Sequence, residues 1–239
     1  MTNHLIAQDC YKKHYPTHRV LSFVSRNRHY TKGQKLALEQ LLPQIGIEYQ
    51  LQPIEFYDIF GCNAPVVLEI GFGMGSSLVD MAKSNSKKNF FGIEVYRPGV
   101  GACLIKARAE CITNLRLICY DAVAVLETMI SSNTLDAVQL FFPDPWQKRR
   151  HNKRRIVQTP FAKLVLKKLK LGGTFHIATD CKSYAEYMLM VINSIYGYKN
   201  CSDNGDWIQR PAFRPYTKFE KKGEKLGHKV WDLMFERVI

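Results

Sequence analysis

The sequence predicts an α/β fold in which a mostly parallel sheet is covered by helices on both faces. From residue 65 onward, short apolar and β-branched runs alternate with segments of helical periodicity. This is the pattern of parallel strands joined by crossover helices. In addition, 46% of the 239 residues are hydrophobic, which is ample for a packed core in a chain whose length suits one large α/β domain or two small ones.

The first 63 residues are expected to be organised differently. Residues 1–30 are basic, rich in histidine and without periodicity, so we expect an arm that lies over the surface or reaches toward a partner. A single domain is expected over residues 31–239. A helix is expected to begin at Thr31, because Thr31 and Gln34 have the residue types and the spacing of a helix capping box. The helix that follows is predicted to end at Pro43, before a linker to about residue 63.

Apolar runs, glycines and caps place the elements of the alternating region. Strands are expected at residues 66–70, 89–94, 115–119, 135–142, 174–178 and 231–238. Helices are expected at residues 76–84, 99–110, about 123–130, 160–170 and 184–196. Thr159 and Pro160 would begin the fourth of these helices as N-cap and first residue, and Gly172 and Gly173 would close it.

Charge and cysteine content restrict the possible functions. The chain carries 34 Lys and Arg against 21 Asp and Glu, a net charge of +13, which favours a polyanionic partner such as nucleic acid or an anionic surface. The seven cysteines are scattered, so neither a disulfide framework nor a zinc site is predicted. No apolar run has the form of a membrane span or signal peptide. We therefore expect a cytoplasmic protein with no metal and no membrane partner.

Five acidic residues lie at or just after the ends of predicted strands. In an open parallel sheet, ligands bind beyond the carboxyl ends of the strands, near the point where the strand order reverses. A single acidic residue at such a place is most often solvated, whereas five in corresponding positions indicate a ligand site. The five residues are Glu69, Glu94, Asp121, Asp144 and Asp180.

Gly71, Gly73 and Gly75 form a glycine-rich turn after the first predicted strand. Their spacing differs from that of the Gly-x-Gly-x-x-Gly dinucleotide fingerprint, and the Gly-Lys-Ser/Thr ending of a phosphate-binding loop is missing. The carboxylate of Glu94 can accept hydrogen bonds from both hydroxyls of a ribose, and Asp121 lies where an adenine edge would be read. This set resembles the cofactor site of Rossmann-like S-adenosylmethionine-dependent methyltransferases, with a ligand-free tight turn as the alternative.

Residues 141–155 join an acidic turn to a basic run. Prolines 143 and 145 fix their own φ and keep the preceding residues out of a helix, so Asp144 is presented on a stiff loop. Phe142 and Trp146 are candidates to stack on a splayed base, with core packing as the alternative. The neighbouring cations would neutralise phosphates, or form a merely solvated face.

Three separated motifs narrow the resemblance. They are residues 22–24 with 31–34, residues 142–146 with the basic run up to 155, and residues 214–220 continuing through 226–233. From about residue 20 to the C-terminus they resemble the bacterial tRNA (guanine-N7)-methyltransferases, in which a third proline is common where this sequence has Gln147. The resemblance implies a seven-stranded Rossmann-like sheet, S-adenosylmethionine as cofactor, and tRNA as partner, methylated at N7 of a variable-loop guanine.

The resemblance also implies roles for individual residues, with Asp144 as the catalytic one. Cofactor contacts are implied for Glu69, Gly71, Gly73, Gly75, Glu94, Asp121 and Asp144. Substrate contacts are implied for Lys148, Asp180, Thr217, Lys218, Phe219 and Glu220. RNA contacts are implied for Arg150, His151, Asn152, Lys153, Arg154 and Arg155.

The chemistry of this reaction suits the residue types. N7 of guanine carries a lone pair and no proton, so methyl transfer needs alignment more than a general base, and neither His151 nor His228 is assigned an acid–base role. A fixed carboxylate such as Asp144 can stabilise the positive charge that develops on the purine. Two alternatives are an RNA-binding protein with a degenerate cofactor site and a nicotinamide-dependent oxidoreductase, which the glycine spacing disfavours. Monomer and homodimer are both open.

Overall fold

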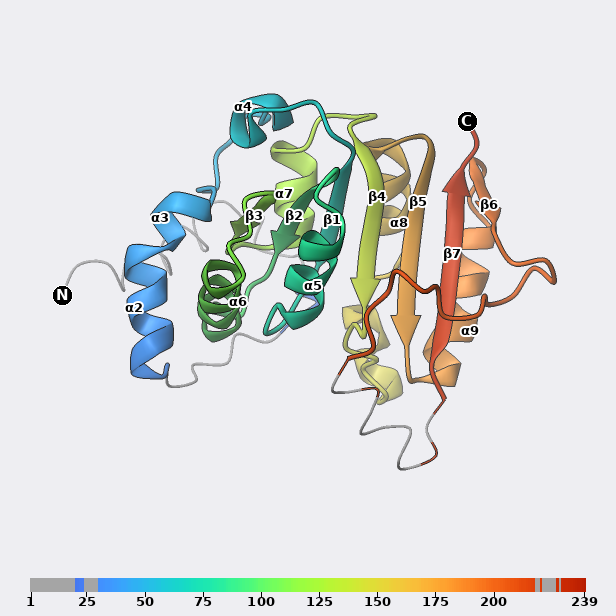
Figure 1. Cartoon of the computed structure of the whole chain (residues 1–239). Coiled ribbons are helices and arrows are strands. Elements are labelled where there is room, and N and C mark those ends of the chain that lie inside the picture. The colour runs from blue at the N-terminus through green and yellow to red at the C-terminus, as the bar shows by residue number, and fades with distance from the viewer. Residues whose placement is uncertain (1–19, 24–29, 218–219, 221–226, 228) are drawn as a thin grey trace.

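A computed structural model describes residues 20–23, 30–217, 220, 227 and 229–239. Its centre is a seven-stranded sheet with the strand order β3-β2-β1-β4-β5-β7-β6 (Figure 1). The first five strands along this order are parallel, whereas β7 pairs antiparallel with both β5 and β6. The predicted α/β fold with a mostly parallel sheet is therefore confirmed.

The strands are β1 (Val66–Ile70), β2 (Asn89–Ile93), β3 (Leu115–Ile118), β4 (Leu135–Phe141), β5 (Leu169–Thr179), β6 (Tyr198–Asn200) and β7 (Trp231–Arg237). The α-helices of the described residues are α2 (Lys32–Gln40), α3 (Leu42–Ile45), α4 (Phe56–Phe60), α5 (Ser76–Ser84), α6 (Arg97–Ala109), α7 (Ala122–Thr128), α8 (Thr159–Lys168) and α9 (Lys182–Asn193). A 3₁₀ helix, η1 (Arg149–Arg154), lies in the basic run.

The predicted start of the first helix is confirmed, but its predicted end is wrong. The Gln34 backbone N–H donates to Thr31 Oγ1 at 3.2 Å, and the Thr31 N–H donates to Gln34 Oε1 at 3.0 Å, which is the expected capping box. Pro43 does not terminate the helical segment. It lies in the first turn of α3, where a missing N–H costs no helical hydrogen bond.

The prediction that Gly172 and Gly173 close a helix is also wrong. Helix α8 ends at Lys168, and β5 begins with the next residue. The two glycines lie at a register irregularity between β4 and β5, where the pairing shifts between Leu135 and Ala137. Gly172 has a φ of 77° there, a backbone conformation that is unfavourable for residues with a Cβ atom. Short elements were missed as well, namely α3 and α4 before β1, η1 in the basic run, and β6 at the sheet edge.

Helices cover both faces of the sheet, as Figure 1 shows. On one face, side chains from α7, α8 and α9, such as Val125, Phe161 and Tyr184, pack with the strands. On the other face, Leu38, Leu78 and Leu104 from α2, α5 and α6 form a second apolar layer. Strands covered on both sides are expected to be apolar throughout, and all five residues of β1 are buried.

The strand order reverses between β1 and β4. From β1 the chain runs outward through β2 to β3, and then returns to β4 on the other side of β1. Connections from β1 and β4 therefore leave the sheet toward opposite faces, and open α/β sheets form their ligand-binding crevice at such a point. The glycine turn follows β1 and the Asp144 turn follows β4, so the fold brings the two predicted motifs to the same crevice.

Candidate active site

The glycine turn uses its glycines for two different physical reasons. Gly71, Gly73 and Gly75 all have positive φ, between 56° and 74°, a conformation that side chains disfavour. A Cβ at Gly71 or Gly73 would meet no atom within 4 Å, whereas one at Gly75 would lie 2.4 Å from the Cβ and Sγ of Cys103. The first two glycines thus border open space suited to a ligand, and the third lets α5 approach α6.

Glu94 ties the glycine turn to the end of β2. Its Oε2 accepts a hydrogen bond from the Gly73 N–H at 2.8 Å, and its Oε1 accepts from Val95 N at 2.7 Å and Tyr96 N at 2.9 Å. Burial raises the pKa of Glu94, the three N–H donors lower it, and the negative charge of Asp144 raises it further, with a net upward shift. A carboxylate has about four acceptor sites, so Glu94 holds the turn and retains capacity for a ligand donor.

Glu69 is a buried carboxyl group at the inner side of the crevice. It is 3% exposed, and its Oε2 has no hydrogen-bond partner within the described part of the chain. Burial raises its pKa to about 8, with a smaller contribution from the charge of Glu94. Glu69 is therefore protonated at neutral pH in this environment. An orphaned buried polar atom carries a desolvation cost, which a bound cation or hydrogen-bond donor would remove.

Asp121 follows β3 and is 2% exposed. Its Oδ1 accepts a hydrogen bond from the Ala124 N–H at 2.9 Å, which caps the N-terminus of α7. Next to it, the ring of Tyr120 stacks on Tyr49 with centroids 3.8 Å apart. Asp121 thus has a structural task at the carboxyl edge of the sheet, in addition to the predicted cofactor contact.

Asp144 is exposed on the loop that follows β4. Two non-glycine residues in the left-handed region flank it: Phe142 with φ 53° and Trp146 with φ 42°. Such backbone costs of order 1–3 kcal/mol per residue and persists where surrounding contacts enforce it. Here the Phe142 N–H donates to the Ala178 carbonyl at 2.7 Å, and the Trp146 Nε1–H donates to the Ser22 carbonyl at 3.2 Å. The turn is therefore held from β5 and from the N-terminal segment.

The basic run after Asp144 divides into exposed and anchored cations. Lys148, Arg149, Arg150 and Lys153 are exposed. Arg155, in contrast, is only 7% exposed, because its Nε donates to the Pro145 carbonyl at 2.8 Å and its guanidinium lies 4.7 Å and 5.4 Å from the ring centres of Tyr184 and Tyr187. A residue that contacts phosphate is expected to be exposed, whereas the buried Arg155 side chain is bonded to the Asp144 turn.

Arg154 and His151 pack on Trp146. The Arg154 guanidinium lies 5.0 Å from the indole centre, and the His151 ring meets it edge-to-face at 5.9 Å. Partial burial and the charges of the surrounding cations, Arg150 first among them, lower the pKa of His151. His151 is thus neutral at pH 7. With a cation over its ring and its N–H donated to Ser22, Trp146 anchors the turn as well as lining it.

Described residues of the C-terminal motif lie against the segment that carries Asp144, since the Arg214 guanidinium is 5.8 Å from the ring centre of Phe142. The Thr217 N–H donates to Glu220 Oε2 at 2.9 Å, and the Glu220 N–H donates to Thr217 Oγ1 at 3.1 Å. Glu220 is 3% exposed and also accepts from Arg214, so its carboxylate is used within the protein. Asp180 is half-buried just after β5. The predicted contacts of Lys218 and Phe219 lie outside the described residues.

Sequence reasoning missed three members of a buried charged cluster: His176, Arg214 and Asp232. His176 Nε2 lies 2.8 Å from Asp232 Oδ1, and Arg214 Nη2 donates to Asp232 Oδ2 at 2.9 Å. No local signal identifies them, because 56 positions separate His176 from Asp232. The motif match at residues 214–220 pointed to the segment, but not to a buried ion pair.

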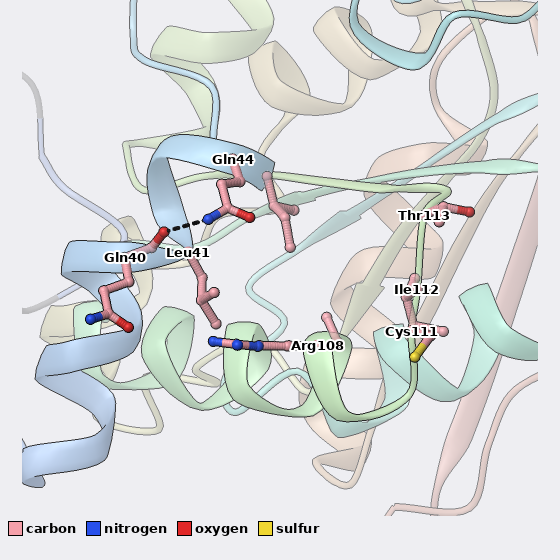
Figure 2. A pocket seen from close by; sticks show the side chains of 9 residues that line it. Gln40, Leu41, Gln44, Arg108, Cys111, Ile112 and Thr113 are labelled. Carbon is pink, nitrogen blue, oxygen red and sulfur yellow. Dashed lines mark hydrogen bonds between the residues drawn. The ribbon is translucent and has the colours of Figure 1, made fainter.

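Other features lie away from the crevice or are missing from the described residues. A pocket of about 570 Å³ is lined by residues of α2, α3, the C-terminal end of α6 and the loop that follows α6, including Gln44, Arg108 and Cys111 (Figure 2). In the described part of the chain, no group of three or more His, Cys, Asp or Glu side chains is arranged to hold a metal ion. Over the same residues, no helix has the length and apolar character needed to cross a membrane.

Comparison with known proteins gives matches over the full chain. Residues 63–233 match the family described as "Putative methyltransferase". The proteins named tRNA (guanine-N(7)-)-methyltransferase from Salmonella choleraesuis (strain SC-B67) and Cronobacter sakazakii (strain ATCC BAA-894) are 58% and 57% identical over 238 residues, with 100% of both chains covered in each case.

Solved structures share the fold at low sequence identity. The aminoglycoside resistance methyltransferase NpmB1 has a TM-score of 0.54 and 14% identity, covering 80% of this chain and 95% of that chain. TrmN from Thermus thermophilus has a TM-score of 0.52 and 12% identity, covering 86% of this chain and 48% of that chain. At such identities the likeness supports the fold alone.

Proposed function

This chain belongs to the family of tRNA (guanine-N(7)-)-methyltransferases, and we propose that it transfers a methyl group from S-adenosylmethionine to N7 of a variable-loop guanine in tRNA. The observation that carries the proposal is the meeting of three segments at the switch point. They are the glycine turn after β1, the Glu94 end of β2, and the Asp144 turn after β4. The negative charge of Asp144 is near enough to raise the pKa of Glu94.

S-adenosylmethionine fits this site by charge and by shape, because its positive charge favours the ionised form of Glu69, which is protonated in the free protein. Its sulfonium and ammonium groups are cations, and its ribose hydroxyls are hydrogen-bond donors. Glu69 offers a buried Oε2 that no described residue satisfies, and Glu94 retains acceptor capacity. The backbone at Gly71 and Gly73 borders open space. When bound, the cofactor supplies an electrophilic methyl group, and the acidic residues hold and orient the molecule that bears it.

Asp144 is proposed to act electrostatically on the guanine. N7 has no proton to lose, so the reaction requires alignment of the N7 lone pair and stabilisation of the charge that moves onto the purine. Asp144 is exposed to a substrate, yet its backbone is held on both sides by Phe142 and Trp146. A carboxylate in a fixed position needs little reorganisation as the charge develops. The neutral imidazole of His151 is turned toward Trp146 and takes no proton in this scheme.

The guanine is proposed to lie between the Asp144 turn and the segment at Thr217. Asp180 and Asp144 provide acceptors for the N–H groups on its Watson–Crick edge. Phe142 and Trp146 are both half-buried, and each has a guanidinium near its ring, Arg214 at 5.8 Å and Arg154 at 5.0 Å. Phe142 is the better stacking candidate because the indole of Trp146 is also fixed by the bond from its N–H to Ser22. This arrangement assigns Trp146 mainly to holding the loop.

The exposed cations next to this turn are proposed to bind the tRNA backbone. Lys148, Arg150 and Lys153 are directed to solvent from η1 or its N-cap, and the net charge of +13 favours a polyanion. Arg155 is left out of this set because it is buried against Tyr184 and Tyr187. A tRNA substrate also favours a cytoplasmic location.

Nucleoside analysis tests the proposal directly. Unmodified tRNA is incubated with the full chain and S-adenosylmethionine labelled in its methyl group, then digested and separated. Label in 7-methylguanosine is expected. Label in a different nucleoside would overturn the proposed position, and tRNA binding without cofactor binding or label would identify a non-catalytic RNA-binding protein.

A further inference from the structure

Arg214 is a fully buried cation at the junction of three chain segments. It has 0% relative exposure. Its Nη2 donates to Glu220 Oε1 at 2.6 Å and to Asp232 Oδ2 at 2.9 Å, and its Nε lies 2.7 Å from Asp232 Oδ1. A buried charge is tolerated when it is paired and hydrogen-bonded. The segment that contains Arg214 is thereby bonded to Asp232 near the start of β7.

The same guanidinium contacts the segment that carries Asp144. Its Cζ lies 5.7 Å from the ring centre of Phe141 and 5.8 Å from that of Phe142. Phe142 is the residue with left-handed backbone two positions before Asp144. A guanidinium against an aromatic ring is stabilising, more so away from water. Arg214 therefore supports the strained side of the Asp144 turn from within the protein.

Arg214 is also linked through Glu220 to Thr217, the last residue of the segment 214–217, which we call the Thr217 segment. The carboxylate of Glu220 accepts from Arg214 through Oε1 and from the Thr217 N–H through Oε2. Arg214 and Thr217 are thus both bonded to Glu220, the first by an ion pair and the second by reciprocal hydrogen bonds. The guanidinium of Arg214 therefore contacts Phe142 directly and is linked to Thr217 through Glu220.

We propose that Arg214 is a positioning residue for methyl transfer, which sets the Asp144 turn and the Thr217 segment at a fixed separation across the guanine site. The proposal rests on the proposed function of that site. Arg214 is too deeply buried to touch a substrate, so it acts through Phe142 and Glu220. A guanidinium is required, because one flat group pairs with the carboxylates of Glu220 and Asp232 while its Cζ lies near the rings of Phe141 and Phe142. Lysine provides only a compact charge.

Arg214→Lys in the full-length chain tests this role. The variant keeps the buried charge, and loses the guanidinium and the stacking on Phe142. We expect the single-turnover rate at saturating tRNA and cofactor to fall at least tenfold, while the cofactor Kd from calorimetry stays within twofold and the protein remains folded. Arg116→Lys is the matched control, since Arg116 also lies over a phenylalanine, Phe60 at 5.3 Å, but at the far edge of the sheet on β3.

A second variant covers the case in which Arg214→Lys does not fold. Asp232→Asn removes one charge beside the guanidinium while Glu220 still pairs with it, and we expect a smaller fall in the same rate. A folded variant of either kind that keeps the wild-type rate would overturn the proposal, as would unfolding of both, which would make Arg214 a stability residue. Failure of the proposed function itself would appear as unlabelled tRNA with the wild-type enzyme.

Discussion

The backbone N–H of Gly73 donates a 2.8 Å hydrogen bond to Oε2 of Glu94, so the glycine turn and the end of β2 form one structural unit. The charge of Glu94 therefore has two tasks in the proposed site: it fixes the turn and it accepts hydrogen bonds from the cofactor. Substitutions that keep the shape of the side chain separate these tasks best.

Glu94→Gln is expected to weaken cofactor binding by about 1.5–3 kcal/mol, because a hydrogen bond to a charged acceptor is worth about this much. Titration calorimetry with S-adenosylmethionine measures the effect. Glu39→Gln is the control, since Glu39 is an exposed glutamate on α2 with a side chain that is 60% exposed. Affinity for tRNA should be unchanged in both variants. A folded Glu94→Gln protein with wild-type cofactor affinity would remove Glu94 from the site.

Glu69 should make stability depend on pH in an unusual direction. Its pKa is raised to about 8 in the folded protein from an ordinary value of 4.5. The folded state therefore holds a proton that the unfolded state has released, and the free energy of unfolding falls as pH rises from about 4.5 to 8. A pKa that differs by one between the folded and unfolded states corresponds to about 1.4 kcal/mol, so the total is on the order of a few kcal/mol.

Glu69→Gln mimics the protonated side chain and should reduce this loss of stability. Urea unfolding at several pH values between 5 and 8 measures it, and the variant should exceed the wild type most at the upper end. Glu39→Gln again provides the comparison with an exposed carboxylate. Parallel curves for the wild type and Glu69→Gln would contradict the raised pKa.

Asp144→Asn should lower the rate of methyl transfer far more than the affinity for either ligand. The amide keeps the size of the side chain, whereas the charge is needed most when the purine becomes cationic. A barrier increase of about 2.7–4 kcal/mol is expected, as for the removal of a preorganised electrostatic group. Single-turnover kinetics measure it, with Asp203→Asn in an exposed loop as control. A near-normal rate would reduce Asp144 to a residue of the turn.

The exposed and buried cations of the basic run should behave differently. Replacing Arg150 and Lys153 by Gln is expected to weaken tRNA binding and to reduce the slope of log affinity against log salt by roughly 0.7–0.9 for each phosphate that the variant no longer neutralises. Lys87→Gln with Lys88→Gln removes the same charge from an exposed turn elsewhere. Equal slopes for the two double variants would place the RNA path away from η1.

Arg155→Gln should instead lower the melting temperature and leave the salt slope unchanged. The substitution removes a hydrogen bond to the Pro145 carbonyl and the packing of a guanidinium on Tyr184 and Tyr187. Thermal unfolding and binding at several salt concentrations separate the two effects. A change in slope without a change in melting temperature would show that the Arg155 side chain leaves this position and meets phosphate.

The sequence was sufficient to predict features that depend on local pattern. Alternation of apolar runs with helical segments predicted β1 to β5, and the Thr31–Gln34 spacing predicted a cap that the structure contains. Because parallel strands end at one edge, the positions of Glu94 and Asp144 followed without knowledge of any contact. The sequence did not predict which two strands flank the point where the strand order reverses, because this depends on β4 pairing with β1 and not with β3.

Features that depend on distant partners were not predictable in this way. Arg155 belongs to a basic run in the sequence, yet it is buried because Tyr184 and Tyr187 on α9 lie over it. Glu220 belongs to a polar motif, yet its side chain is buried and pairs with Arg214. Pro43 and Gly172 have the residue types that end helices, but Pro43 lies in the first turn of α3 and Gly172 lies at an irregularity of β5.

The Asp144 turn is held by residues from near both ends of the chain. Ser22 bonds Trp146 across 124 positions, while Arg214 contacts Phe142 from the C-terminal side. Domains emerge from the ribosome with the N-terminal part first, so β1 to β4 can assemble while the segment with Arg214 is still being translated. The arrangement makes competence for methylation one of the last properties that the nascent chain acquires, after the cofactor crevice at β1 and β2 has been synthesised.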